Sequence, residues 1–206
     1  MLKEDDLITI RRHLHQIPEV ALEEVETHAF LMQVIGMMDQ KFLKILEPKE
    51  LPTAILVRVQ GSDPSRTIGY RTDIDGLPVD EKTGLPYASQ HPGKMHACGH
   101  DTHITILLGA AKVLAAMKDQ LTVTVRFLFQ PAEEEIANSG AAYMKEEPLV
   151  KECDRLIALH IWSKIPAGWA SLRYGPVMSA ADTFDVTVEL SLIHISEPTR
   201  RRGISY

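Results

Sequence analysis

The fold of this chain is decided by one stretch, Met95-His96-Ala97-Cys98-Gly99-His100-Asp101-Thr102-His103. It gathers a thiol, three imidazoles and a carboxylate, and all of these groups bind transition metals. Gly99 permits a tight turn, so that Cys98 and His100 can point toward one position. A helical pattern from Ile104 to about Lys118 follows, and the partial positive charge at its start favours thiolate at Cys98. The stretch therefore predicts a metal site, with a loop that is merely rich in histidine as the alternative.

The bulk composition is that of an ordinary globular protein. The chain has 206 residues, of which 45% are hydrophobic and 24% charged, and this length fits one domain, or one and part of another. A net charge of −6 gives no reason to expect nucleic acid or an anionic membrane as a partner. Two cysteines make no disulfide framework, and the start of the chain lacks the apolar core of a signal peptide. We therefore expect a cytoplasmic protein.

Three predicted strands are each followed by groups that bind metals or transfer protons. Each group is a weak signal alone, because aspartates are common in loops and glutamates often begin a helix. Open α/β sheets hold their ligands at the carboxyl ends of their strands, so the coincidence of all three indicates a site. The strands and the groups after them are Ile68–Thr72 with Asp73 and Asp75, Leu121–Gln130 with Glu133 and Glu134, and Arg155–Leu159 with His160.

Further elements complete an α/β fold, which we expect to be a mostly parallel sheet flanked by helices. Apolar residues at helical spacing predict two helices near the N-terminus, and alternating or apolar runs predict further strands. The expected helices are Glu4–Gln16, Val20–Met38 and Gly140–Lys145, and the expected strands are Thr53–Gln60, Gly168–Tyr174 and Thr183–Leu190.

Several motifs resemble those of the M20 metallopeptidase family, in its amidohydrolase branch. They follow the family's order over about residues 10 to 190, so the resemblance is specific. It implies a partial catalytic domain over residues 1–180 and the start of a lid and dimerisation domain over 181–190. The motifs are Arg12-x-x-Leu14-His15-x-x-Pro18-Glu19, Tyr70-Arg71-Thr72-Asp73-Ile74-Asp75-Gly76-Leu77-Pro78, His96-Ala97-Cys98-Gly99-His100-Asp101-x-His103, Phe129-Gln130-Pro131-Ala132-Glu133-Glu134 and Leu159-His160.

The resemblance implies a ligand set for two divalent ions, which could be zinc, manganese or cobalt. Cys98 and His100 would be ligands, and the thiolate of Cys98 could bridge the two ions. Glu134 and His160 would complete the set that this chain supplies.

The remaining acidic residues would act on protons or on the orientation of ligands. Glu133 would be the general base, although the adjacent Glu134 could exchange roles with it. Asp75 would orient a metal ligand through a hydrogen bond. Asp73 stands where other branches of the family carry a ligand histidine, so its role stays open between ligation and catalytic support.

The implied reaction is the hydrolysis of the amide bond of an N-acyl amino acid. A structural zinc would need four closed ligands and no spare base, so the carboxylate left over argues for catalysis. The segments Tyr70–Leu85 and Gly84–Ser89 most resemble those of family members that act on N-acetyl-diaminopimelate in lysine biosynthesis, and this resemblance implies the same substrate. The alternatives are another N-acyl amino acid, as in aminoacylases and hippurate hydrolases, or a non-catalytic metal-binding fragment.

The end of the chain departs from the family. Residues 191–206 match none of its patterns and resemble translated sequencing-adaptor sequence, so we expect an artefactual tail, with a genuine short tail as the alternative. The family's later part, with a further ligand histidine, is not present in this sequence. We therefore expect the fragment to be inactive, and its full-length parent to be a homodimer or a higher oligomer.

Overall fold

The computed structural model describes residues 4–46, 48, 50–177 and 186–187. The chain divides into two units, residues 1–163 and 164–206. All the helices and strands of the described residues belong to the first unit.

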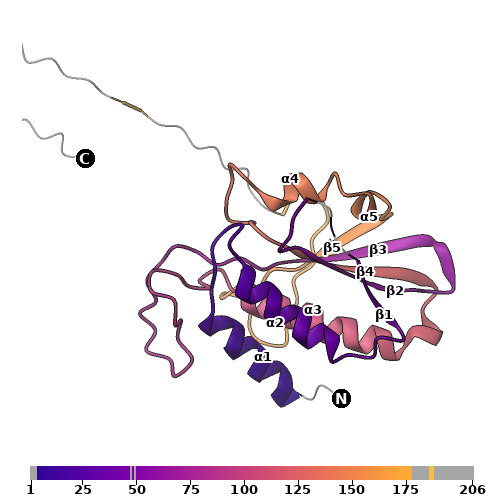
Figure 1. The fold of residues 1–206 in the computed structure, drawn as a ribbon, viewed down its shortest axis with the longest axis horizontal. Coiled ribbons are helices and arrows are strands. Elements are labelled where there is room, and N and C mark those ends of the chain that lie inside the picture. The colour runs from indigo at the N-terminus through magenta and orange to yellow at the C-terminus, as the bar shows by residue number, and fades with distance from the viewer. Residues whose placement is uncertain (1–3, 47, 49, 178–185, 188–206) are drawn as a thin grey trace, which may run out of the picture. The chain divides into compact units, whose positions relative to one another are not determined.

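A mixed five-stranded sheet forms the centre of this unit (Figure 1). The order of its strands is β1-β2-β4-β3-β5. The pairs β4–β3 and β3–β5 are parallel, whereas β1–β2 and β2–β4 are antiparallel. The predicted α/β class is confirmed, with three adjacent parallel strands and an antiparallel margin. The strands are β1 Leu43–Leu46, β2 Ile55–Val59, β3 Asp63–Asp73, β4 Val123–Gln130 and β5 Arg155–Ala158.

Helices cover both faces of the sheet. In Figure 1, α1, α2 and α3 lie on one side of it and the short helices α4 and α5 on the other. The helices are α1 Glu4–Gln16, α2 Val25–Gly36, α3 His100–Ala116, α4 Gly140–Met144 and α5 Pro148–Lys151, with a 3₁₀ turn at Lys118–Gln120.

The strand β4 shows why this layering forms. Its side chains alternate between the two faces, as the geometry of a strand requires. Phe127 and Phe129 are fully buried in the core shared with α1, α2 and α3, whereas Leu128 joins a smaller core with Met144 of α4. Burial of such side chains stabilises the fold by about 1.5–3 kcal/mol each. The larger core holds α3 against the sheet, and so fixes where α3 begins.

The N-terminal helices agree with the sequence only in part. The helix predicted over Glu4–Gln16 is confirmed, and it buries Ile10 and Leu14. The second helix begins at Val25, not Val20, because Leu22 has a left-handed φ of 63°. The backbone N–H of Leu22 donates to the carboxylate of Glu24, which stabilises this turn ahead of the helix.

Two other expectations need correction. The helix expected from Ile104 begins at His100, because Gly99 adopts a φ of 91° and caps it. The strand expected over Gly168–Tyr174 was wrong: the segment is irregular, and Gly168 has a φ of 85°, which an extended strand does not allow. The strand β1 was not predicted. The strand expected over Thr183–Leu190 lies outside the described residues, except for positions 186 and 187.

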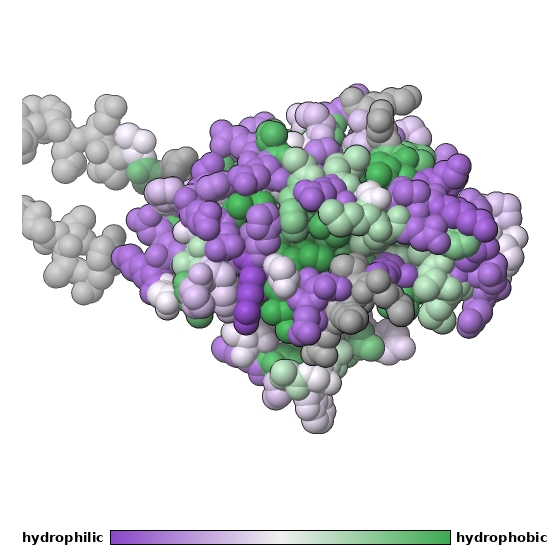
Figure 2. Space-filling view, turned by 60° about the horizontal axis from the view of Figure 1, so that its bottom comes forward, coloured by the Kyte–Doolittle hydropathy of each residue, from purple (hydrophilic) through white to green (hydrophobic). Residues whose placement is uncertain are grey.

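The helical face also carries an apolar groove. It has a volume of about 570 Å³ and lies between α1 and α2, where Phe30, Val34 and Met37 contribute to its lining. Figure 2 shows hydrophobic surface interspersed with hydrophilic side chains on the face that carries α1. Among the described helices, none is long and apolar enough to cross a membrane.

Candidate metal centre

The carboxyl ends of the three parallel strands meet at one edge of the sheet. Asp73 is the last residue of β3 and pairs with Gln130, the last residue of β4. Glu133 follows β4, and His160 follows β5, which pairs with β3 on its other side. The predicted convergence of these strand ends is therefore present in the structure.

The start of α3 brings two imidazoles to the same edge. Gly99 takes the left-handed conformation that glycine adopts without strain, and Cys98 lies just before it. His100 is the first residue of the helix, and His103 lies three positions on, so both rings share one helix face. Both are buried, with 1% and 2% of their surface exposed.

Side chains suited to a metal converge in this place. One donor atom each from Cys98, His100 and Glu134 lies within 4.8 Å of the others. The sulfur of Cys98 is 3.3 Å from Nε2 of His160. The structure therefore brings together all four residues that the sequence suggested as ligands.

Two atoms of this group lack a hydrogen-bond partner. Nε2 of His100 and Oε1 of Glu134 are buried and unpaired among the described residues. They lie 3.6 Å apart. Buried polar atoms are almost always paired, because an unpaired one costs about 1–3 kcal/mol. A cysteine sulfur, an imidazole nitrogen and a carboxylate oxygen form a donor set that suits zinc or a similar ion.

Asp75 aligns this donor set. Nδ1 of His100 lies 2.8 Å from the backbone oxygen of Asp75 and 3.2 Å from its Oδ1, which leaves Nε2 directed into the site. The other carboxylate oxygen of Asp75 accepts the backbone N–H of Glu134 at 2.9 Å. Asp75 thus contacts one candidate ligand directly and orients the backbone of another, as expected for a residue that supports a metal site.

The electrostatics of His100 show that the site is short of positive charge. Burial opposes protonation of the ring, but the hydrogen bond to Asp75, the nearby sulfur of Cys98 and the charge of Asp73 raise its pKa to about 11. Carboxylates surround the ring at short range, with Glu133 and Glu134 each 3.6 Å from Nε2. A divalent cation would supply this missing charge and replace the proton on Nε2.

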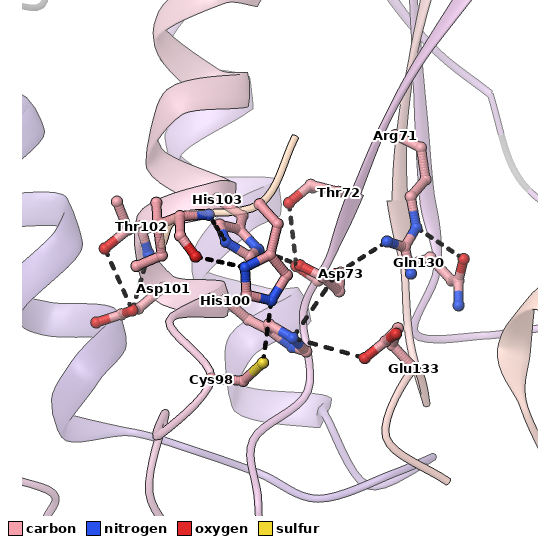
Figure 3. A network of polar contacts seen from close by, with 12 residues as sticks. Arg71, Thr72, Asp73, Cys98, His100, Asp101, Thr102, His103, Gln130 and Glu133 are labelled. Atoms are coloured by element: carbon pink, nitrogen blue, oxygen red, sulfur yellow. Dashed lines mark hydrogen bonds and ion pairs between the residues drawn. The ribbon is translucent and has the colours of Figure 1, made fainter. Parts of the chain in front are cut away.

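Glu133 lies beside these donors but is more exposed. Its Oε2 is 3.6 Å from Nε2 of His100, and 38% of its side-chain surface is exposed (Figure 3). Partial burial raises the pKa of its carboxyl, and the neighbouring charges of Asp73 and Glu134 add to this, against the charge of His100. A carboxylate with a raised pKa, open to substrate, suits a general base.

The turn that carries Glu133 and Glu134 is supported by a residue that the sequence did not indicate. Ala132 has a left-handed φ of 50°, unusual for a residue other than glycine. Its backbone N–H donates to Oε1 of Glu24 at 2.8 Å, and its oxygen accepts the N–H of Gly140 at 3.0 Å. Glu24 is the supporting residue: it is fully buried, and its carboxylate holds the turn at Ala132 in place.

Asp73 differs from the candidate ligands because both its oxygens are paired. Oδ1 lies 2.7 Å from Nδ1 of His103, and Oδ2 accepts a hydrogen bond from Arg71 at 2.9 Å (Figure 3). Burial opposes ionisation, but the hydrogen bond from His103 and the charges of His100 and Arg71 lower the pKa of Asp73 to about 2. Asp73, His100 and His103 nevertheless form a second group whose donor atoms could hold a metal.

The sequence places His103 among the metal-binding groups of the stretch Met95–His103, but it gives this residue no role in the site. The spacing of His100 and His103 is the signal that could have found it, because residues three apart lie on one face of a helix. This signal was lost because the helix was expected to begin only at Ile104.

Fold and site together define a class: α/β proteins with a candidate metal centre of cysteine, histidine and glutamate at the ends of parallel strands. The model of peptidase family M20/M25/M40 matches residues 69–201. The chain belongs to this family.

Two curated relatives carry the same name. The N-acetyldiaminopimelate deacetylase of Limosilactobacillus fermentum is 52% identical over 196 residues, covering 91% of this chain and 49% of the relative. The enzyme of the same name from Lacticaseibacillus casei is 50% identical over 192 residues, covering 92% and 49%. The chain therefore spans about half the length of the curated relatives it matches.

A solved structure supports the same assignment. The Bacillus subtilis YXEP protein, described as a dinuclear metal-binding peptidase of the M20 family, has a TM-score of 0.73 and 36% identity. The match covers 79% of this chain and 44% of that one. Human carnosine dipeptidase 1, with a TM-score of 0.54 and 16% identity, shares the fold.

Proposed function

We propose that this chain is part of a metal-dependent amidohydrolase that removes the acetyl group from N-acetyl-diaminopimelate in lysine biosynthesis. The observation that carries the proposal is the pair of buried, unpaired atoms, Nε2 of His100 and Oε1 of Glu134, next to the partly exposed carboxylate of Glu133. The names of relatives about half identical to this chain support the substrate.

The proposed metal residues are Cys98, His100, Glu134 and His160. Two divalent ions bound there would lower the pKa of a water from 15.7 toward about 7 and polarise the amide carbonyl of the substrate. The sulfur of Cys98 lies 3.3 Å from Nε2 of His160 and within 4.8 Å of donor atoms of the buried pair, so it would hold a metal together with either of them. Asp75 holds His100 through Nδ1, so that only Nε2 is offered to an ion.

Glu133 is the proposed proton carrier. Its carboxylate accepts a proton from the attacking water as the new carbon–oxygen bond forms. It then gives this proton to the nitrogen as the carbon–nitrogen bond breaks, so that acetate and a free amine are released. The raised pKa of Glu133 favours both transfers, because the carboxyl must take up and release a proton in one cycle. Adjacent Glu134, with its buried oxygen, is the less accessible of the two.

The test is acetate release by the full-length gene product that contains this sequence. We expect metal-dependent turnover of N-acetyl-diaminopimelate, faster than turnover of N-acetylmethionine or hippurate. Faster hydrolysis of either competitor would overturn the substrate, and loss of all metal-dependent turnover would overturn the function. The 206-residue chain by itself should release no acetate, since β5, the edge strand of the sheet among the described residues, has all four of its residues exposed.

Assembly and location belong to the same proposal. We propose a cytoplasmic homodimer or higher oligomer, because both cysteines are free thiols and the M20 resemblance includes a dimerisation domain. The mass of the full-length protein in solution, from light scattering, tests the assembly, and a monomer would contradict it.

A further inference from the structure

Two groups of side chains could hold a metal, and they share His100. The first is Cys98, His100 and Glu134, and the second is Asp73, His100 and His103. Their hydrogen bonds distinguish them. Both contain the unpaired Nε2 of His100, but the first adds the unpaired Oε1 of Glu134, whereas Asp73 has a partner for each oxygen.

Both ring nitrogens of His103 are also in use. Nε2 lies 3.0 Å from the backbone nitrogen of Ile161, and a backbone N–H can only donate, so Nε2 is the acceptor. The proton of the neutral ring is therefore on Nδ1, which donates to Oδ1 of Asp73 at 2.7 Å. With Asp73 also held by Arg71, these atoms form a closed chain that leaves no lone pair of His103 for an ion.

This chain of hydrogen bonds ends next to a proposed ligand. Ile161 follows His160 directly, and the ring of His160 packs against the ring of His103, with centroids 4.7 Å apart. The side chain of Ile161 lies over Gly99, where a Cβ atom would overlap it. The segment after β5 is thus attached to the start of α3 at two successive positions.

The attachment is important because β5 provides little support. All four of its residues are exposed, and it pairs with β3 alone among the described strands. His160 is itself exposed. Its contact with the sulfur of Cys98 therefore depends on the path of the segment that follows β5.

We infer that His103 is a positioning residue that holds His160 against Cys98, and that Asp73 acts on the metal site by fixing the tautomer of His103 and is not a ligand. The inference rests on the proposed function, because it takes His160 to be a metal ligand. It goes beyond the proposed function because it assigns a role to Asp73, which the sequence left open, and to His103, for which the sequence gave none.

A double-mutant cycle tests it, with metal affinity measured by chelator competition in the full-length gene product. His103→Ala should weaken metal binding about 10–100-fold, the usual effect of losing a residue that orients a ligand. In a His160→Ala background the same substitution should have no further effect, because His103 acts through His160. Unchanged affinity in His103→Ala, or additive losses in the double variant, would overturn the inference and leave the proposed function intact.

Two controls complete the cycle. His13→Asn removes an exposed histidine of α1, packed on Phe30, and should leave metal affinity unchanged. If His160→Ala alone does not weaken metal binding, the proposed ligand set fails, and the inference fails with it.

The tautomer offers a test that needs no substitution and no metal. Long-range ¹H–¹⁵N NMR of the metal-free protein should show the His103 proton on Nδ1. A proton on Nε2 would overturn the inference. If His103→Ala does not fold, His103→Gln keeps an acceptor for the N–H of Ile161 and should retain more of the metal affinity than His103→Leu, which has none; equal losses would overturn the inference.

Discussion

Two polar clusters start from successive residues of α3, and they differ in how completely they are paired. The carboxylate of Asp101 has a partner for each oxygen: Oδ2 accepts from Nδ1 of His15 at 2.7 Å and from Nε of Arg11 at 2.9 Å. Oδ1 accepts the N–H of Thr102 at 2.8 Å. Around His100, in contrast, Nε2 and a carboxylate oxygen of Glu134 are buried without partners.

The comparison shows that composition does not distinguish a structural cluster from a metal site. Both clusters consist of buried histidines and carboxylates within hydrogen-bond range, and Figure 3 shows Asp101 and His100 directed to different sides of the start of α3. Only the pairing differs. A cluster that satisfies itself contributes to stability, whereas one with open donor atoms needs an ion.

The largest effect is expected at the open cluster. Glu133→Gln should lower kcat about 10²–10⁴-fold with metal content unchanged, because it removes a proton acceptor of similar shape. Glu134→Gln should weaken metal binding first, because its oxygen is a proposed ligand. Metal analysis beside steady-state rates separates the two, and the reverse pattern would exchange their roles.

A smaller effect, on the free energy of unfolding, should distinguish the Asp101 cluster from the His100 cluster. Asp101→Asn should lower the free energy of unfolding by about 1.5–3 kcal/mol, since it removes the charge that pairs with Arg11 and His15. Metal affinity should not change. The matched variant Asp75→Asn should instead weaken metal binding about 10–100-fold, because it alters the carboxylate contacts to Nδ1 of His100 and to the backbone N–H of Glu134. Urea denaturation and chelator competition on both variants make the comparison, and a common effect on metal affinity would contradict it.

The smallest effect is on the pH dependence of stability. The hydrogen bond to Asp101, opposed by burial, raises the pKa of His15 above 6.5, so the folded state binds the proton more tightly than the unfolded state. This stability is fully present below pH 6.5 and is lost as the pH rises through the raised pKa. The difference in unfolding free energy between wild type and His15→Gln should therefore shrink above pH 6.5. A difference that grows with pH would contradict this direction.

Local patterns predicted much of the site. A strand followed at once by acidic residues or histidine was recognisable three times, and parallel pairing then brought Asp73, Glu133 and His160 to one edge. The turn at Gly99 was also predictable, because its conformation depends on glycine itself. These features depend on residues close together in the sequence.

The features that were missed depend on contacts between distant residues. Glu24 supports the turn at Ala132 from 108 positions away, and His103 contacts Ile161 from 58 positions away. The strand expected over Gly168–Tyr174 failed for a related reason, since an apolar pattern forms a strand only where a neighbouring strand pairs with it. The pairing state of each donor atom, on which the metal assignment depends, is likewise a property of the fold and not of the motif.

X-ray absorption at the zinc edge tests the central claim most directly, with the zinc-loaded full-length gene product and its Cys98→Ser variant. The account predicts a sulfur shell at about 2.3 Å in the wild type that is absent from the variant, because Cys98 is a ligand beside His100 and Glu134. A shell of nitrogen and oxygen alone in the wild type would contradict the account, and would favour the group of Asp73, His100 and His103 instead.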